Sequence, residues 1–503
     1  MGDQGTRDEA GGRDEAGGRD GESDVLADRR RKLESLRAAG VEPFPHEFDG
    51  VEPIASVRAA HEGLAAGEET EVAHRVAGRL AARRGQGKMA WLDLEDRSGR
   101  IQLQARVDEL GQEGRNSMEG LVSLDLGDLI GVDGIAFVSR RGELSLRVTD
   151  FTLLAKSLRP PPDKHHGLTD VETRHRHREL DLIANPETRA LFIARAKVVS
   201  TVRRFLDDEG FIEVETPVLQ PLYGGAMARP FTTHHNALDR DLYLRIATEL
   251  YLKRLIVGGL ERVYEIGKNF RNEGVDTTHN PEFTVLEWYE AYADYLDVAD
   301  RCERLVHAVA QAVGYEGEVD FAPPWRRETL AGAVLDRTGI DILALRDRDA
   351  LAAGMRERGL AASEERTWPQ LVDDLVSDHV EPTLVQPTFL LDFPIEISPL
   401  AKEHRETPGL VERFEAFVGG MELANAFTEL NDPDEQRRRF ESQRRFAAAG
   451  DDEAQPYDEA FVQALEQGMP PTGGIGIGID RLVMAMTGTR SIRDVVLFPA
   501  LRS

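Results

Sequence analysis

Aromatic, acidic and basic side chains alternate between residues 262 and 290 in a way that suits a nucleotide. One strand-like run leads through a loop into a second, and an extended chain places alternate side chains on one face. Two sets of side chains therefore share a face: Arg271 with Glu273, if the first strand continues, and Phe283 with Val285, Glu287 and Tyr289. A guanidinium can pair bidentately with phosphate, and an aromatic ring can stack on a base. Ordinary cross-strand ion pairing is the competing interpretation.

The stretch from Glu415 to Glu429 is rich in carboxylates and shows the same alternation. Asn425, Phe427 and Glu429 share one face if the chain is extended, and Glu415 and Glu422 lie upstream. Carboxylates without basic neighbours repel one another unless a cation lies between them. Oxygen ligands with few nitrogen or sulfur partners favour magnesium. Solvated surface acids are the competing interpretation in a chain this acidic.

Two glycine-rich segments could let a ligand approach the backbone. Residues 473–481 read GGIGIGIDR, and glycine at alternate positions predicts a strand that a ligand can approach closely. The spacing fits neither a dinucleotide-binding fingerprint nor a phosphate-binding P-loop. Arg481 lies at the start of an apolar helix, where a positive charge and the helix N-terminus both favour an anion. The turn at Gly224 and Gly225 could line a small-molecule pocket, although turn geometry alone explains it equally well.

From about residue 74 to residue 154 the pattern changes to short β-strands. The predicted strands are Val76–Leu80, Ala90–Leu94, Ile101–Ala105, Leu129–Phe137 and Leu144–Leu153. Five short strands suit a small closed barrel of the OB type. Such barrels bind single strands by stacking bases on aromatic rings and hydrogen-bonding their edges, and Trp91 and Gln102 could supply both contacts. A half-buried tryptophan and a surface glutamine would explain the two residues as well.

Composition divides the chain into five segments. Residues 1–23 are rich in glycine and charge and predict a disordered tail. Residues 24–73 predict a helical segment, whose basic side chains contact either a phosphate backbone or solvent. The barrel covers residues 74–155, a proline-containing linker residues 156–175, and a large mixed domain of helices and strands residues 176–503.

Charge and composition limit the classes of function. The chain has 62 basic and 90 acidic residues, a formal charge of −28, which argues against binding nucleic acid or anionic membrane through overall charge. A single cysteine excludes an internal disulfide and a zinc site built from paired cysteines. We find neither a signal-peptide pattern nor a run of about 18 apolar residues, and expect a cytoplasmic protein without membrane contact.

Taken together, these stretches resemble the class II aminoacyl-tRNA synthetases, and among them the lysyl-tRNA synthetases. The three class II motifs resemble residues 210–217, 270–283 and 476–481, and the blocks at 224–226, 234–238 and 425–433 are similar to the lysyl subfamily. The resemblance runs from about residue 74 to the C-terminus. It implies an α+β protein, with an N-terminal OB-type β-barrel followed by a class II synthetase catalytic domain, an antiparallel sheet flanked by helices.

The resemblance implies ATP-dependent activation of L-lysine to lysyl-adenylate, followed by transfer to the 3′ end of tRNA(Lys) in translation. It assigns ATP binding to Arg271, Glu273, His279, Phe283, Glu422 and Arg481. Arg271 and Arg481 would be the catalytic pair, on the α-phosphate and γ-phosphate respectively. Mg²⁺, entering with ATP as co-substrate, would be bound by Glu415 and Glu422. Positioning and charge neutralisation dominate such chemistry.

For the amino acid, the resemblance agrees with a direct physical argument. A lysine ammonium in a closed pocket must be paired, because desolvating an isolated charge is very unfavourable. Glu429 would be its partner, and Glu249 would hold the α-amino group. The remaining lysine-binding residues would be Gly225, Glu287, Tyr289, Asn425 and Phe427.

Further partners follow from the same resemblance. The barrel would read the anticodon of tRNA(Lys) through Trp91, Gln102 and Glu143, and the first motif implies a homodimer. Two alternatives are a lysine ligase that modifies a protein, which would normally lack the barrel, and a non-catalytic RNA-binding paralogue. The latter is expected to lose Arg271, Arg481 or Glu429, and all three are present.

Overall fold

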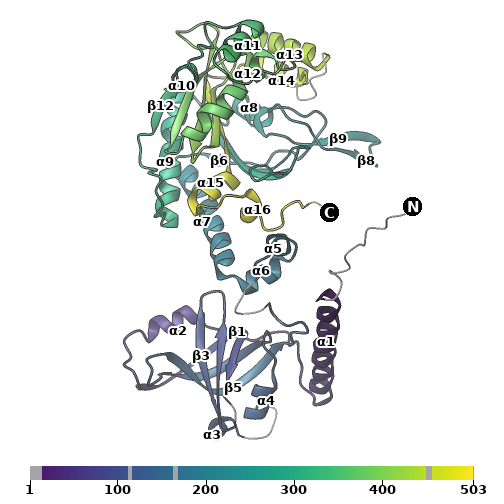
Figure 1. The fold of residues 1–503 in the computed structure, drawn as a ribbon, viewed down its shortest axis with the longest axis vertical. Helices are drawn as coiled ribbons and strands as arrows, with labels where there is room; N and C mark the ends of the chain where they lie inside the picture. Colours follow the sequence, from purple (N-terminus) through teal and green to yellow (C-terminus); the bar gives the residue numbers. More distant parts are fainter. Residues whose placement is uncertain (1–13, 86, 112–115, 163–167, 449–455, 502–503) are drawn as a thin grey trace, which may run out of the picture. The chain divides into compact units, whose positions relative to one another are not determined.

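The chain folds into two compact units, Met1–Leu168 and Thr169–Ser503, as Figure 1 shows for the computed structural model. The structure describes residues 14–85, 87–111, 116–162, 168–448 and 456–501. The boundary between the units falls inside the predicted linker, residues 156–175. No helix within the described ranges is both long and apolar enough to cross a membrane.

The first unit is built around a closed five-stranded barrel, which confirms the predicted OB-type architecture. Its strands are β1 (Glu69–Arg84), β2 (Met89–Glu95), β3 (Arg100–Arg106), β4 (Leu129–Val138) and β5 (Leu144–Ala155), in the spatial order β1-β2-β3-β5-β4. Neighbouring strands are antiparallel except for β3 and β5, which run parallel. Alternation fills the barrel, because Ile101, Leu103 and Ala105 are buried while Gln102 and Gln104 are partly exposed.

The described part of this unit also contains the helices α1 (Asp14–Ala38), α2 (Ile54–Ala60), α3 (Val107–Leu110) and α4 (Met118–Ser123). Helix α1 begins ten residues before the predicted boundary at Asp24, and residues 1–13 of the predicted tail lie outside the described residues. Two of its basic side chains are used in packing. Arg29 is buried and donates to the carbonyl of Leu126 at 3.0 Å, and Lys32 pairs with Asp125 at 2.6 Å.

The second unit contains an eight-stranded sheet in the order β12-β13-β14-β15-β16-β11-β10-β6. The bounds are β6 (Ile212–Glu213), β10 (Arg262–Phe270), β11 (Glu282–Ala291), β12 (Arg326–Thr329), β13 (Thr388–Pro394), β14 (Leu410–Val418), β15 (Met421–Thr428) and β16 (Thr472–Gly478). All neighbours are antiparallel except the two pairs at the edges, β6 with β10 and β12 with β13. A mostly antiparallel sheet with separate helices confirms the predicted α+β class.

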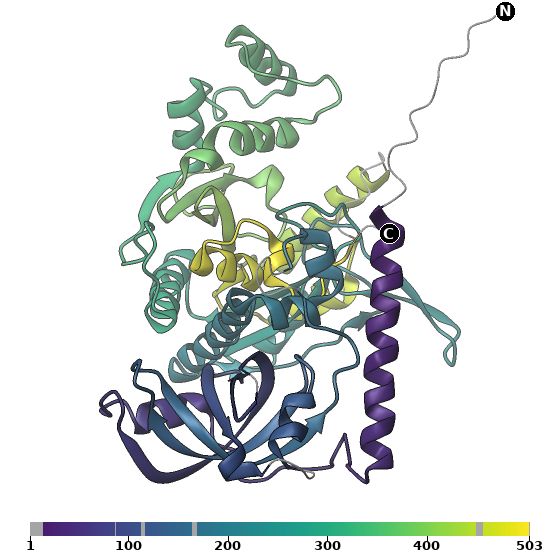
Figure 2. The ribbon, with the colours of Figure 1, turned by 60° about the horizontal axis from the view of Figure 1, so that its bottom comes forward.

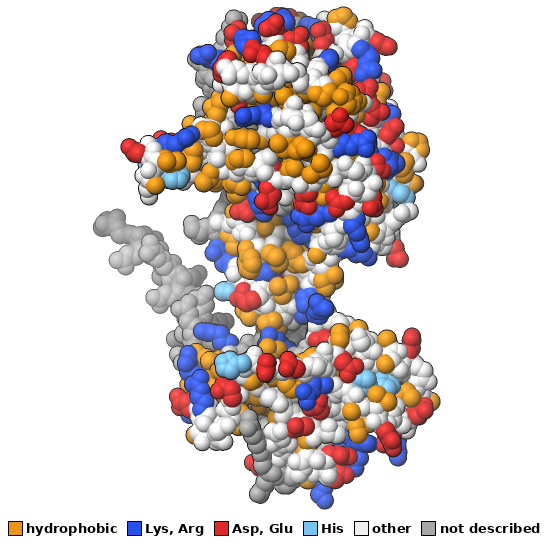
Figure 3. All heavy atoms as spheres, turned by 180° about the vertical axis from the view of Figure 1, so that it is seen from behind, with side chains coloured by type: hydrophobic (Ala, Val, Ile, Leu, Met, Phe, Trp, Pro, Cys, Tyr) orange, Lys and Arg blue, Asp and Glu red, His pale blue; other side chains and the backbone are white. Residues whose placement is uncertain are grey.

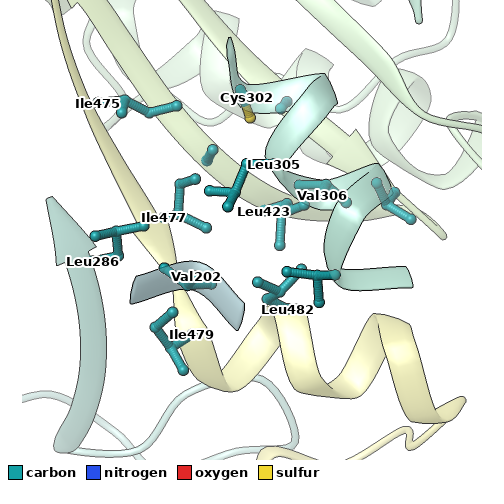
Figure 4. Packing of buried hydrophobic residues seen from close by; sticks show 14 of the residues in the cluster. Val202, Leu286, Cys302, Leu305, Val306, Leu423, Ile475, Ile477, Ile479 and Leu482 are labelled. Carbon is teal, nitrogen blue, oxygen red and sulfur yellow. The ribbon is translucent and has the colours of Figure 1, made fainter. Parts of the chain in front are cut away.

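One face of this sheet is covered by three amphipathic helices, α7 (Pro186–Asp208), α9 (Tyr295–Val313) and α15 (Ile479–Thr487). Figure 4 shows their contact with the sheet, where Ile475 and Ile477 of β16 pack near Cys302, Leu305 and Val306 of α9. Cys302 is fully buried and unpaired. Burial of this face leaves the opposite face of the same strands for the polar side chains.

The remaining elements of this unit surround the sheet. A small sheet joins β7 (Leu219–Gln220), β9 (Arg240–Leu244) and β8 (Thr232–His235), and β8 and β9 form a hairpin that projects from the rest of the unit (Figures 1 and 2). The further helices are α5 (Val171–Arg176), α6 (Arg178–Ala184), α8 (Glu249–Val257), α10 (Leu330–Thr338), α11 (Arg348–Glu357), α12 (Trp368–Leu375), α13 (Pro433–Ala448), α14 (Glu459–Leu465) and α16 (Ile492–Val495).

Candidate active site

The polar face of the sheet forms a cavity of about 450 Å³. All fourteen residues of this unit that the sequence analysis assigned to a site line it: Gly225, Glu249, Arg271, Glu273, His279, Phe283, Glu287, Tyr289, Glu415, Glu422, Asn425, Phe427, Glu429 and Arg481. They come from segments separated by up to about 250 residues, from Gly225 to Arg481, and the sheet order brings those segments together.

Glycines on β16 make room for the cavity. Gly474 lies between Tyr289 of β11 and Phe427 of β15, and Gly476 lies between Glu287 and Asn425. A Cβ on Gly474 would collide with Glu429 Oε1 and the Tyr289 ring. The sequence predicted that a ligand could approach this strand closely. The structure explains the glycines by the large side chains on both neighbouring strands, which need the space above β16.

Gly225 has a similar steric role at another wall. Its φ is +87°, and a Cβ there would lie 3.0 Å from the Cβ atoms of both Ala247 and Glu249. Only glycine fits both the left-handed backbone and the close packing against the start of α8. This turn fixes the position from which the Glu249 side chain enters the cavity.

Three buried carboxyls line one end of the cavity. Glu249 opens helix α8, Glu287 lies on β11, and Glu429 directly follows β15. Glu287 accepts from the Thr248 amide at 3.0 Å and from the Tyr289 hydroxyl at 3.3 Å. Burial raises the pKa of Glu287 to about 7 and that of Glu429 to about 8, and it also raises the pKa of Glu249.

A buried lysine of the chain, Lys253, lies behind these acids and was not predicted. Its Nζ is 2.5 Å from Glu249 Oε1 and also pairs with Glu429 Oε2. The signal available in the sequence was the spacing of four residues between Glu249 and Lys253, which places both on one side of a helix. That spacing is common on helix surfaces, so it did not indicate a buried pair.

The guanidinium groups of Arg271 and Arg481 also line the cavity. Arg271 lies 5.1 Å from the centre of the Phe283 ring, and its Nε has no hydrogen-bond partner among the described residues. Strand β10 ends at Phe270, so Arg271 and Glu273 lie in the loop beyond it. Burial lowers the pKa of Arg271 from its usual range, and an unpartnered buried guanidinium N–H suits an anionic ligand.

Arg481 lies in the first turn of α15 and contacts two of the predicted residues. It donates to Glu422 at 3.0 Å and lies 3.4 Å from His279. The preceding Asp480 is buried, pairs with Arg195 at 2.6 Å and accepts from the Thr284 amide at 2.7 Å. These contacts fix the helix start and therefore the direction of the Arg481 side chain.

The sequence analysis assigned a metal site to Glu415 and Glu422, which lie on β14 and β15 and both line the cavity. Within the described ranges, no group of three or more histidine, cysteine, aspartate or glutamate side chains is arranged to hold a metal ion. Burial raises the pKa of Glu415 to about 7; Arg413, which donates to it at 2.6 Å, opposes that rise, and Glu422 adds to it. The two carboxylates are hard donors that repel each other, which fits a pair of ligands to magnesium whose remaining ligands come from elsewhere.

Arg413 is a second residue that the sequence analysis missed. It lines the cavity, lies 4.4 Å from the centre of the Phe393 ring and 5.5 Å from that of Phe427, and donates to Asn425 at 3.2 Å. It therefore orients Phe427 and Asn425. Its alternation with Glu415 along one strand was a signal, but only the fold shows that both enter the cavity.

In the first unit, Trp91 on β2 and Gln102 on β3 share one face of a hairpin, because Trp91 pairs with Gln104 and Asp93 with Gln102. Gln102 accepts from the Ser145 hydroxyl at 3.1 Å. Glu143 is exposed in the turn before β5 and pairs with Arg58 at 3.4 Å. The Trp91 ring is half-buried, 6.4 Å from that of Phe137.

Comparison with known families agrees with this architecture. Residues 170–502 match the model for tRNA synthetases class II (D, K and N), and residues 74–154 match the OB-fold nucleic acid binding domain. The fold and cavity are therefore those of a class II tRNA synthetase with an OB-fold domain.

Comparison with individual relatives shows which family within this class the chain matches. The chain is 53% identical to the lysine–tRNA ligase of Roseiflexus castenholzii over 95% of this chain and 99% of the relative. It is 52% identical to that of Chloroflexus aurantiacus, over 95% and 98%, and 50% identical to that of Bacillus subtilis, over 95% and 97%. The chain belongs to the lysine–tRNA ligase family.

Proposed function

We infer that this protein activates L-lysine with ATP and transfers the lysyl group to the 3′ end of tRNA(Lys). The observation that carries this inference is the anionic end of the cavity, where Glu249, Glu287 and Glu429 surround space for a ligand. A buried group of carboxyls with too few cations favours a cationic ligand. Free lysine carries two ammonium groups and so suits this end better than a neutral or acidic amino acid.

We assign the two ammonium groups to different acids. Glu429 would pair with the ε-ammonium at the far wall, and Glu249 would hold the α-ammonium. Glu287, fixed by the Thr248 amide, supports the pocket and adds negative charge. Gly225, Tyr289, Asn425 and Phe427 would complete the walls around the aliphatic part of the side chain.

The activation step needs positioning more than proton transfer. One lysine carboxylate oxygen attacks the α-phosphorus of ATP, the bond from that phosphorus to the oxygen bridging the β-phosphate breaks, and pyrophosphate leaves with the electron pair. Arg271 would hold the α-phosphate and Arg481 the γ-phosphate. Glu273 and His279 would position the nucleotide, and Phe283 would stack on the adenine. Fixed guanidinium groups stabilise the charge that develops in the transition state.

Magnesium would supply further charge neutralisation on the phosphates. Glu415 and Glu422 would bind it through carboxylate oxygens, with phosphate oxygens and water as the other ligands. The protein's own part is to keep the two carboxylates in place through Arg413 and Arg481.

The barrel provides a second contact with tRNA. We propose that Trp91 stacks on an anticodon base while Gln102 and Glu143 hydrogen-bond base edges. We further propose that two copies associate, because Ile212, Val218 and Leu219, in and just after the first motif, are exposed. Figure 3 shows hydrophobic side chains gathered on one face of the second unit. The reaction would take place in the cytoplasm, where charged tRNA is consumed by translation.

Lysine-dependent exchange of labelled pyrophosphate into ATP tests the activation step. We expect exchange with lysine and magnesium, and none when either is omitted. Charging of a tRNA(Lys) transcript with labelled lysine then tests transfer. Exchange with another amino acid but not with lysine would contradict the assignment of the substrate.

A further inference from the structure

Among the described residues that surround the cavity, Lys253 is the one whose fully buried ammonium contacts two of the substrate-facing acids. It lies one turn after Glu249 on α8 and has no exposed side-chain surface. Its Nζ pairs with Glu249 and Glu429 together and lies 6.0 Å from the centre of the Tyr289 ring. The acids it joins come from separate elements, so it links α8 to the end of β15.

We propose that Lys253 is a positioning residue that sets selectivity for a doubly cationic amino acid, by holding Glu249 and Glu429 at a fixed spacing as carboxylates. The proposal rests on the inferred lysine activation. Lys253 itself does not line the cavity. It acts through the two glutamates, whose other oxygens remain for the substrate.

The orientation of Glu429 supports this role. Oε2 pairs with Lys253, while Oε1 lies over Gly474 at the cavity wall and has no hydrogen-bond partner among the described residues. A buried carboxylate oxygen without a donor is unfavourable until a ligand supplies one. Lys253 thus occupies one side of the carboxylate and directs the other side toward the cavity.

Charge balance gives the selectivity. Three buried carboxyls, Glu249, Glu287 and Glu429, face one another here, and Lys253 is the cation that contacts two of them. Arg413 on β14 also acts electrostatically on Glu249, but it pairs with Glu415. The two ammonium groups of lysine, added to Lys253, balance the three carboxylates. An amino acid with one ammonium leaves one buried carboxyl either charged without a partner or protonated.

The pKa directions agree with this geometry. Burial lowers the pKa of Lys253, but Glu249 and Glu429 outweigh that effect and leave it above its usual value, so the group stays cationic. Burial raises the pKa of Glu429, while Lys253 opposes the rise and Glu249 and Glu287 add to it. Removing the ammonium would therefore raise the pKa of Glu429 further and leave less of the carboxylate at neutral pH.

The test is Lys253→Met, which keeps the length of the side chain and removes its charge. We expect KM for lysine in pyrophosphate exchange to rise about tenfold or more, with KM for ATP unchanged within about twofold. We also expect the pH above which KM for lysine levels off to move upward by about one unit. Lys253→Arg keeps the charge but displaces it, so its KM for lysine should lie between those of the wild type and Lys253→Met, with a pH profile close to that of the wild type.

Lys156→Met is the matched control, because Lys156 is also a buried lysine between two carboxylates, in the barrel unit. It should lower stability without changing KM for lysine. If Lys253→Met changes only stability, or raises both KM values equally, the proposal is wrong. If Lys253→Met does not fold, an unchanged KM for lysine in Lys253→Arg overturns it. Failure of the wild type to use lysine would instead contradict the proposed function.

Discussion

Among the described residues, each unit buries a lysine between two carboxylates, and the two arrangements differ in how completely the protein supplies donors to the acids. In the barrel, Lys156 lies 2.7 Å from Asp125 and 2.9 Å from Asp128. Every carboxylate oxygen of these two acids accepts at least one hydrogen bond. Besides Lys156, the donors are Lys32 to Asp125 and the Ser157 and Asp125 amides to Asp128. The protein itself therefore supplies a donor to every oxygen of these two acids.

In the second unit, Lys253 joins Glu249 and Glu429, but Glu429 Oε1 lacks a donor and the acids line a cavity. The pKa shifts are opposite in direction. Burial raises the pKa of Asp125, yet Lys156 and Lys32 outweigh it and leave the pKa below its usual value. The pKa of Glu429 rises to about 8.

The difference teaches how to separate a structural ion pair from one prepared for a ligand. Both units bury a lysine with two acids, so this feature alone does not separate a structural ion pair from one prepared for a ligand. An acid that remains short of donors after the fold is complete has a raised pKa, and a ligand can supply what is missing. Substitutions and a change of pH can test that distinction and the separate role of the barrel, from the largest expected effect to the smallest.

Lys156→Met should destabilise the barrel by about 3–5 kcal/mol, because it leaves the buried Asp128 without its cation and leaves Asp125 with Lys32 alone. Hydrogen exchange of the amides of β1 to β5 measures the loss. Lysine-dependent pyrophosphate exchange should keep its KM for lysine under conditions where the chain is folded. A rise in that KM as large as the one expected for Lys253→Met would remove the contrast between the units.

Glu429→Gln should raise KM for lysine about 100-fold, equivalent to about 2.7 kcal/mol, because the substrate ammonium loses a charged hydrogen-bond partner. KM for ATP should change by less than about twofold. Glu357→Gln, at an exposed glutamate ending α11, is the control. Equal loss of lysine and ATP binding would show that Glu429 supports the fold and does not select the substrate.

Trp91→Ala should raise KM for tRNA in the charging reaction by an amount equivalent to about 1–3 kcal/mol, because one stacking contact is lost. Pyrophosphate exchange does not require tRNA and should be unaffected. Charging and exchange measured on the same preparation separate the two effects. A matching fall in exchange would assign Trp91 to the core of the barrel and remove it from the tRNA contact.

Lowering the pH from 8 to 7 should raise KM for lysine by up to about tenfold, which one titrating carboxyl allows. The sign follows from the raised pKa: below about 8 the Glu429 carboxyl of the empty site takes up a proton, and a protonated acid does not pair with an ammonium. Barrel stability should stay constant over this interval, because Asp125 has a pKa below its usual value and remains ionised. A KM for lysine that does not change between pH 8 and 7 would contradict the difference in pKa between Glu429 and Asp125.

Much of the fold could be predicted because its signals are local. Alternation in Ile101–Ala105 and the turns between short strands predicted the barrel, and β3 extends that segment by one residue at each end. The same alternation predicted that Phe283, Val285, Glu287 and Tyr289 share a face, and all four line the cavity. The roles of these residues toward lysine, ATP and magnesium stay predictions until they are measured.

Other features could not be predicted because they depend on contacts distant in sequence. Arg271 lies beyond the end of its strand, where no alternation rule applies, so its place in the cavity followed from the family resemblance and not from the strand pattern. Arg413 owes its role to two aromatic rings on other strands, Phe393 and Phe427. Helix α1 begins at Asp14, where the glycine-rich composition had predicted a tail.

The sequence by itself determined the residue types: which strands alternate, where glycine replaces a side chain, and how many acids the region around Glu429 carries. Only the tertiary structure decided which acids are neutralised. Burial and the donors from other elements decide whether the protein pairs both oxygens of a carboxyl or leaves one of them for a ligand. A lysine four residues after a glutamate has the same local pattern on a solvated surface and in a core. The dielectric environment and the second partner, here Glu429, exist only after the sheet and α8 have packed together.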